Sequence, residues 1–420
     1  MIEPLTPNTQ AILLLPAPLI AGRGDTSRDL LSLGEYNRLA RILREKQKQP
    51  ADFLGPDTPE LIELCAQPFG RARLEILLGR GFLLSQAVER WNARAIRVIS
   101  RADGCYPKRL KSRLKEDAPP LLYGCGEIAL LEKGGLAVVG SRHVDNELIS
   151  FAEDVGRISA EAHRSVVSGG AKGIDRAAMH GALRAGGEVA GVMADSLEKS
   201  ALARDNREPL MDGRLVLISP YDPAAGFNVG HAMNRNKIIY ALADAALVVT
   251  TDFEKDGTWA GAIEQLERLH YVPVFVRNGA NAGKGNAALI HHGGKPWPNP
   301  ADRFAFDDTL TAAASAAATE PKQEKWSFKV EEEPPAPLAD QKTTPDETEI
   351  ERLAAKDQLF DAVRAILARE LGEGRSEAEV AELLAVPKAL AKGWLTQLVK
   401  EDALEKLSRP VRYQAVKRLL

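Results

Sequence analysis

The spacing of apolar positions changes along the chain, and each change predicts a different kind of element. Before residue 134 the spacing is mostly helical, with few strand signals. Between Gly135 and Pro298, short apolar runs alternate with amphipathic stretches, which predicts parallel strands joined by helices in a doubly wound α/β sheet. The predicted strands are 136–140, 165–169, 189–193, 215–219, 245–250 and 272–276.

The last hundred residues begin with a segment that cannot form a core. Residues 320–349 hold five prolines and the acidic run Glu331–Glu333, a composition typical of an extended, solvated linker. The preceding run Ala312–Ala318 fits either a terminal helix or the start of this linker.

After the linker, apolar residues return with helical spacing over 359–367, 380–384 and 390–398. The run Ser376–Glu379 has the capping-box spacing that starts a helix, and 404–416 alternates like a hairpin. Three short helices followed by a hairpin predict a winged-helix domain. From Lys388 to Arg418 the chain has eight basic and three acidic residues, so this domain fits either DNA or a protein partner.

These patterns predict four parts. They are a helical N-terminal domain (1–96), a Rossmann-like doubly wound domain (97–310), a linker (311–355) and a C-terminal winged-helix domain (356–420). A length of 420 residues, 45% of them hydrophobic and 27% charged, is normal for a multidomain globular protein. We find no repeat of solenoid period.

Composition also bears on compartment and partners. The longest apolar run, Ala11–Ala21, contains Pro16 and Pro18 and is too short to cross a bilayer, so we expect no membrane association. Three widely spaced cysteines exclude a disulfide framework and a paired-cysteine metal site, which favours a reducing cytoplasm. A net charge of −3 gives no overall basic footprint for nucleic acid.

Two predicted strands end in loops that suit an anion. The first strand runs into Gly140, Ser141 and Arg142, where exposed amides and a guanidinium would hold a phosphate. A structural turn with an exposed arginine explains this tripeptide equally well. The second strand ends in a glycine-rich loop with candidate residues Ser168, Gly169, Gly170, Lys172 and Gly173. The following Asp175 fits a helix cap better than a catalytic acid.

Two further loops add candidate contacts. Asn234, Arg235, Asn236 and Lys237 stand before an apolar helix, where amides would read bases and cations would neutralise phosphates. A polar helix start is the alternative. A loop with Gly257, Thr258 and Trp259 follows the next strand, and its tryptophan either stacks on a base or belongs to the core.

The sequence lacks the motifs of several common cofactor-dependent, hydrolytic and metal-binding sites. The first strand is not followed by GxGxxG, and no acidic residue ends the second strand, so we expect no nicotinamide or flavin cofactor. The chain has neither a Walker lysine loop nor a GxSxG elbow. His291 and His292 are the only adjacent histidines, so no metal site is predicted, and His231 fits a polar contact better than a catalytic role.

The ordered motifs resemble the DNA-processing protein A (DprA/Smf) family over roughly residues 97–296. They are the GSR loop and the DGT loop together with 99–110, 119–123, 168–183, 204–208 and 234–250. The resemblance implies a non-enzymatic, single-stranded DNA-binding protein that works in DNA uptake and recombination. It implies a homodimer, RecA as a candidate recombinase partner, and a SAM/HhH-like N-terminal domain. Arg142 would grip phosphate, with Ser141 and the Gly169–Gly173 amides beside it.

The chain departs from the family pattern at two places. Ala232 and Met233 replace a common Phe-Pro pair, which removes an aromatic contact to a base, and residues 256–262 read DGTWAGA where the family has an SGSLITA-like loop. Two alternatives stay open. One is a nucleotide sensor or phosphoribohydrolase-like enzyme using Glu264, and the other is a winged-helix DNA-binding regulator.

Overall fold

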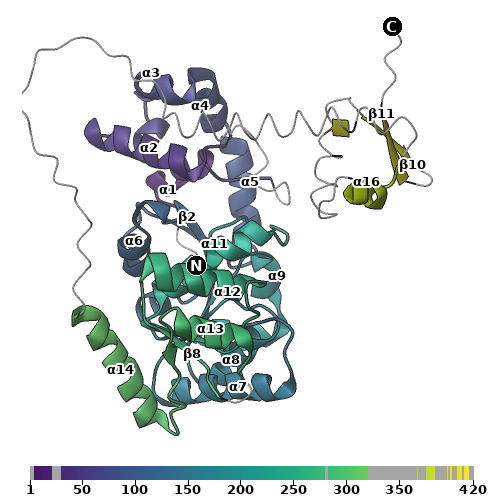
Figure 1. Cartoon of the computed structure of the whole chain (residues 1–420). Coiled ribbons are helices and arrows are strands. Elements are labelled where there is room, and N and C mark those ends of the chain that lie inside the picture. Colours follow the sequence, from purple (N-terminus) through teal and green to yellow (C-terminus); the bar gives the residue numbers. More distant parts are fainter. Residues whose placement is uncertain are drawn as a thin grey trace, which may run out of the picture. The chain divides into compact units, whose positions relative to one another are not determined.

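The computed structural model describes residues 4–20, 30–279 and 282–319, and within the C-terminal part 367, 375–383, 395, 398–399, 404–408 and 411–415. The chain forms two compact units, Met1–Lys325 and Trp326–Leu420 (Figure 1). No helix within these described ranges is long and apolar enough to cross a membrane.

The first unit begins with a cluster of helices that has its own core. Its largest helix opens with a capping box, in which Ser32 and Glu35 each bond the other's backbone N–H. Leu39, Phe53 and Leu74 are almost fully buried in the core of this cluster. The elements are α1 (Pro7–Leu14), α2 (Leu33–Glu45), η2 (Pro50–Leu54), α3 (Thr58–Phe69), α4 (Arg71–Leu78) and α5 (Gly81–Asn92).

A nine-stranded sheet follows, with the order β1-β2-β6-β5-β4-β3-β7-β8-β9. Neighbouring strands from β6 to β9 in this order pair in parallel. Strand β2 pairs antiparallel with both of its neighbours, β1 and β6. The strands are β1 (Arg97–Ser100), β2 (Leu121–Gly126), β3 (Leu136–Val139), β4 (Val166–Ser168), β5 (Val189–Val192), β6 (Leu215–Ser219), β7 (Ala245–Val248), β8 (Val274–Val276) and β9 (Lys295–Pro296).

Helices cover both faces of this sheet (Figure 1). Side chains alternate along β3, so Leu136 and Val138 face one core while Ala137 and Val139 face the other. The first core is completed by α1, α5, α7 (Asn146–Glu161), α8 (Ile174–Arg184) and α14 (Arg303–Thr319). The second is completed by α6 (Lys108–Leu114), α11 (Val229–Leu242), α12 (Gly257–Glu264) and α13 (Lys284–His291).

The remaining described elements of this unit are short. They are η3 (Lys115–Asp117), η4 (Ile128–Glu132), α9 (Leu197–Leu202), α10 (Arg204–Met211) and the π-helical turn η5 (Gln265–Leu269).

The doubly wound sheet is confirmed, and all six predicted strands lie where the apolar runs place them. The six predicted strands pair in parallel, and β1 and β2, which the sequence did not predict, add an antiparallel edge to the sheet. Their signal was weak: β1 has only four residues, and β2 contains Gly124 and Gly126. The run Ala312–Ala318 lies within the helix α14.

The second unit contains α16 (Glu377–Leu383), β10 (Leu404–Ser408) and β11 (Val411–Ala415). The predicted capping box is present, since Ser376 N–H donates to the Glu379 carboxylate and Glu379 N–H donates to the Ser376 hydroxyl. The predicted hairpin is also present, as β10 pairs antiparallel with β11. The linker 320–349 and most of the other two predicted helices lie outside the described residues, and the winged helix stays a prediction.

Candidate functional site

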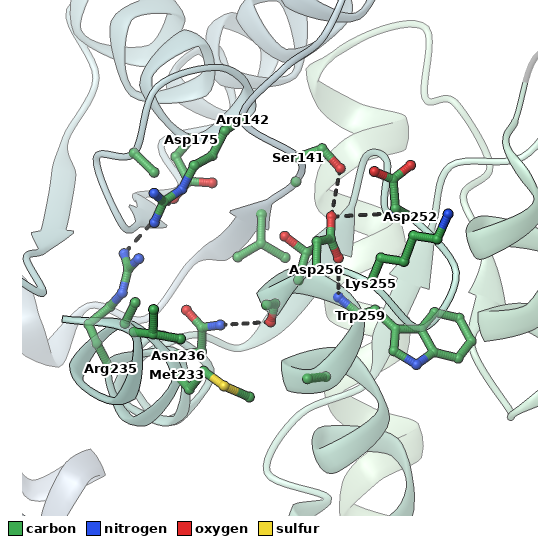
Figure 2. A pocket seen from close by; sticks show the side chains of 18 of the residues that line it. Ser141, Arg142, Asp175, Met233, Arg235, Asn236, Asp252, Lys255, Asp256 and Trp259 are labelled. Atoms are coloured by element: carbon green, nitrogen blue, oxygen red, sulfur yellow. Dashed lines mark hydrogen bonds and ion pairs between the residues drawn. The ribbon is translucent and has the colours of Figure 1, made fainter. Parts of the chain in front are cut away.

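A pocket of about 510 Å³ opens at the carboxyl ends of the parallel strands. The chain moves from β3 to β4 on one side and returns to β7 on the other, so the strand order reverses at β3. Ligands of such sheets bind outside the strands at this switch point. Figure 2 shows the pocket walls, which come from the loops after β3 and β7 and from the starts of α11 and α12.

Eight predicted site residues line this pocket. They are Gly140, Ser141, Arg142, Arg235, Asn236, Gly257, Thr258 and Trp259. Sequence positions more than a hundred residues apart therefore meet in one cavity, as expected for loops at the same edge of a sheet. Their role in binding stays a prediction.

Seven other predicted residues lie outside the pocket lining. They are Ser168, Gly169, Gly170, Lys172, Gly173, Asn234 and Lys237. Ser168 is fully buried and donates its hydroxyl to the Val138 carbonyl at 2.6 Å. Lys172 is exposed, while Asn234 and Lys237 line a neighbouring cavity of about 600 Å³.

Three glycines of these two loops, Gly140, Gly169 and Gly173, cannot carry a side chain without a shift of their surroundings. A Cβ on Gly140 would lie 2.6 Å from the Ile174 side chain, and a Cβ on Gly169 would lie 1.3 Å from Arg235 Nη1. Gly173 has φ +93°, which an L side chain rarely adopts, and it precedes the first residue of α8. These glycines thus allow the ends of β3 and β4 to pack closely against α8 and Arg235. This structural role is independent of any contact with a ligand.

Asp175 does not have the position predicted for it. It lies within the first turn of α8, is 5% exposed and accepts a hydrogen bond from Gly169 N–H at 3.2 Å. Burial raises the pKa of this carboxyl, and the charge of Arg235 and the backbone amides of Ala171, Gly169 and Gly140 oppose that rise. The Asp175 carboxylate therefore fixes the two glycine loops through their backbone N–H groups. Amides that donate to Asp175 are not available to bind a phosphate of a ligand.

Arg235 forms the floor of the pocket together with Asp175 (Figure 2). Its side chain is 6% exposed, and its Nη1 donates to the Val192 carbonyl at 3.0 Å and lies 3.9 Å from Asp175. Burial lowers the pKa of this guanidinium, Asp175 opposes the change, and the nearby charge of Arg142 lowers it further. A buried and an exposed cation that repel each other are both stabilised by an anion beside them.

The exposed guanidinium of Arg142 lies over the ring of Phe227, 4.8 Å from its centroid. Phe227 is 56% exposed and also lines the pocket. Sequence reasoning missed this residue, because one phenylalanine in a loop of glycine and proline carries no periodic signal.

The opposite wall is the loop between β7 and α12, held by Asp256. This carboxylate accepts the hydroxyls of Ser141 at 2.8 Å and Thr251 at 2.6 Å, and caps α12 through Trp259 N–H at 2.8 Å. Trp259 is 9% exposed and packs edge-on against Phe253, with 4.9 Å between ring centroids. Its burial favours the core interpretation over base stacking.

The other two candidate residues, Glu264 and His231, lie outside the lining of this pocket. Glu264 forms ion pairs with Lys237 at 3.4 Å and with Arg268. His231 stacks its ring on Tyr221, with 3.7 Å between centroids. The residues that the structure describes contain no group of three or more His, Cys, Asp or Glu side chains arranged to hold a metal ion.

Fold and pocket together define a Rossmann-like α/β protein with a cleft at its topological switch point that carries both arginine and carboxylate groups. A family model described as DNA recombination-mediator protein A matches residues 97–306. The chain belongs to this family.

Individual relatives agree with this assignment. DNA processing protein DprA of Streptococcus pneumoniae is 30% identical over 200 residues, which cover 47% of this chain and 69% of that protein. Its counterpart in Bacillus subtilis is 29% identical over 191 residues, covering 44% and 62%. The X-ray structure of the Streptococcus pneumoniae protein aligns with a TM-score of 0.53 at 22% identity, over 72% of this chain and 97% of that one, and so shares the fold.

Proposed function

We propose that this protein binds single-stranded DNA, protects it and passes it to a RecA-type recombinase during DNA uptake or recombination. Membership of a recombination-mediator family and the DNA-processing names of its relatives support this proposal. We further propose that the protein acts as a homodimer in the cytoplasm. None of its three cysteines forms a disulfide, which fits a reducing compartment.

The observation that carries the proposal is the pairing of Arg142 with Phe227 at the pocket. A guanidinium binds a phosphate with charge-assisted hydrogen bonds, and an exposed ring stacks on a base. A single strand offers both groups at once, because its bases are unpaired and able to turn outward, whereas a duplex hides its base faces. The pocket therefore favours single strands over duplexes.

We place further phosphate contacts along the same sheet edge. Lys172 is exposed beside the glycine loop, and Asn234 and Lys237 line the neighbouring cavity on α11. A strand that leaves the pocket would meet these groups next. Because the whole chain carries a net charge of −3, we expect the DNA contacts to be few and confined to this edge of the sheet.

The domain boundaries and the winged-helix identity of residues 356–420 form part of this proposal. Val380, Leu395, Leu404 and Tyr413 are buried within the second unit, as the core of such a domain requires. The excess of basic residues within 388–418 fits a second contact to DNA.

A binding titration of the full chain tests the proposal. We expect salt-sensitive binding of a fluorescent single-stranded oligonucleotide, measured by anisotropy, and weaker binding of the matching duplex. Arg142→Ala should weaken binding by about 1 kcal/mol or more, the scale of one charge-assisted contact. Arg142→Lys keeps the charge, so its affinity should lie between those of Arg142→Ala and the unmodified protein.

Arg38→Ala is the control for loss of charge alone, since Arg38 is exposed on α2 and does not line the pocket. Equal affinity of Arg142→Ala, Arg38→Ala and the unmodified protein would exclude this pocket as the binding site. Absence of single-strand binding at low salt would exclude the function itself.

A further inference from the structure

The loop between β7 and α12 gives the pocket a wall that repels phosphate. Asp252, Glu254 and Asp256 all line the cavity, and Lys255 is the one cation among these five consecutive residues, 252–256. The carboxylate of Asp256 already accepts hydrogen bonds from the hydroxyls of Ser141 and Thr251, which fix the loop. Across the part of the chain that the structure describes, the exposed carboxylates of Asp252 and Glu254 have no hydrogen-bond or ion-pair partner.

The facing groups have the opposite character. Arg142 offers an exposed guanidinium and Phe227 an exposed ring. The side chain of Arg235 is buried beside that of Asp175 (Figure 2). Arg235 Nε is buried and has no hydrogen-bond partner within the described residues. Buried donors normally have a partner, so this atom is an exception among the residues that line the pocket.

A ligand that satisfies the exposed groups of the pocket needs three features. It needs an anion for Arg142, a flat face for Phe227, and hydrogen-bond donors for the carboxylates of Asp252 and Glu254. An ionised carboxylate only accepts hydrogen bonds, so it attracts an amino group and repels a carbonyl oxygen. Among nucleotides, cytosine, adenine and guanine carry an exocyclic amino group, whereas the one donor of the thymine base, N3–H, is flanked by the carbonyl oxygens O2 and O4, which a carboxylate repels.

We propose that Asp252 and Glu254 make this pocket select nucleotides whose base carries an exocyclic amino group and disfavour thymine. The proposal rests on single-strand binding at this pocket. The phosphate lies on the Arg142 side, the base stacks on Phe227, and its amino group donates to the acidic loop. The same two carboxylates lower affinity for every strand, because they also repel the phosphates.

Two oligonucleotides of equal length test this selectivity in the full chain, one of thymidine and one of 5-methyl-deoxycytidine. Their bases share ring size and the 5-methyl group and differ at C4, where one carries a carbonyl and the other an amino group, and at N3. We expect the unmodified protein to bind the 5-methyl-deoxycytidine strand about fivefold more tightly at neutral pH, measured by competition anisotropy.

The double variant Asp252→Asn/Glu254→Gln should then show two opposite changes. Its affinity for both strands should rise because two negative charges are gone, and the preference for the amino base should fall to about one, since amides also donate to a carbonyl. The control Glu60→Gln/Asp308→Asn removes the same charge from exposed positions outside the pocket and should keep the preference. If the double variant does not fold, Asp252→Asn and Glu254→Gln are tested separately, and each should reduce the preference for the amino base.

Three results separate this inference from the proposed function. Equal binding of both strands by the unmodified protein overturns the selectivity while single-strand binding stands. A preference that persists in the double variant overturns the assignment to Asp252 and Glu254. Failure to bind either strand overturns single-strand binding itself, and the inference with it.

Discussion

The guanidinium of Arg235 lies 3.9 Å from the carboxylate of Asp175, and less than one-tenth of either side chain is exposed. Burial raises the pKa of Asp175 and lowers that of Arg235, so each charge depends on the other for its presence in the core. Because Asp175 also accepts Gly169 N–H, this pair links α8, α11 and the loop after β4.

Removing one member of this pair should destabilise the fold strongly. Asp175→Ala leaves Arg235 buried without its counter-charge, and we expect a loss of about 3 kcal/mol in the free energy of unfolding, measured by urea denaturation. The double variant Asp175→Ala/Arg235→Met, which removes both charges, should recover part of this loss. A loss in the single variant no larger than that of an exposed substitution would show that the pair is not a structural element.

Gly169 should not tolerate even one extra carbon. A Cβ there would lie 1.3 Å from Arg235 Nη1, whereas a Cβ on Gly257, at the start of α12, would meet nothing within 4 Å. We expect Gly169→Ala to lose about 2 kcal/mol of stability and to weaken DNA binding by displacing Arg235. Gly257→Ala is the control and should keep its melting temperature. Equal melting temperatures for both variants would contradict the close packing at Gly169.

Much of this site could be predicted from the sequence because parallel strands carry it. Apolar runs located β3, β4 and β7, and since their carboxyl ends share one edge, Ser141, Arg142 and Thr258 were expected together. Which of the polar side chains would be buried could not be predicted from the local sequence. Arg235 and Lys237 look alike in sequence, yet the structure places one beneath the pocket and the other in an ion pair with Glu264. Their difference arises from helix rotation, which depends on what α11 packs against.

The antiparallel edge and Phe227 were missed for a related reason. Strand β1 is defined by pairing with β2 across more than twenty residues, and its own four residues carry little periodicity. Phe227 gains its role from Arg142, which is distant in sequence. Tertiary contacts of this kind leave no local pattern.

Acid should weaken the attachment of α4 to α2. Arg73 donates to both carboxylate oxygens of Glu35, at 2.6 and 3.1 Å, and chiefly this hydrogen bonding lowers the Glu35 pKa from 4.5 to about 2, although partial burial opposes it. A depressed carboxyl pKa stabilises the fold above the unfolded value, and this stability is lost as pH falls from about 4.5 through about 2.

Glu35→Gln should therefore lower the melting temperature at neutral pH and make it less sensitive to acid. Because Glu35 is about one-third exposed, we expect a modest effect of about 1 kcal/mol at neutral pH, shrinking near pH 2. Thermal denaturation across this range measures it, with Glu60→Gln on α3 as an exposed control. Parallel curves for Glu35→Gln and the unmodified protein would show that the pair contributes nothing that depends on pH.

Phe227 should contribute to DNA binding without contributing to stability. Its ring is 56% exposed beneath Arg142, so truncation removes a stacking surface and a cation–π partner and leaves no cavity in the core. We expect Phe227→Ala to weaken single-strand binding by about 1 kcal/mol or more with an unchanged melting temperature. Phe227→Trp offers a larger face and should bind at least as well as the unmodified protein. Abasic oligonucleotides provide the internal control, because they lack the bases that would stack. If Phe227→Ala weakened abasic and normal strands equally, the ring would act only by orienting Arg142 toward phosphate.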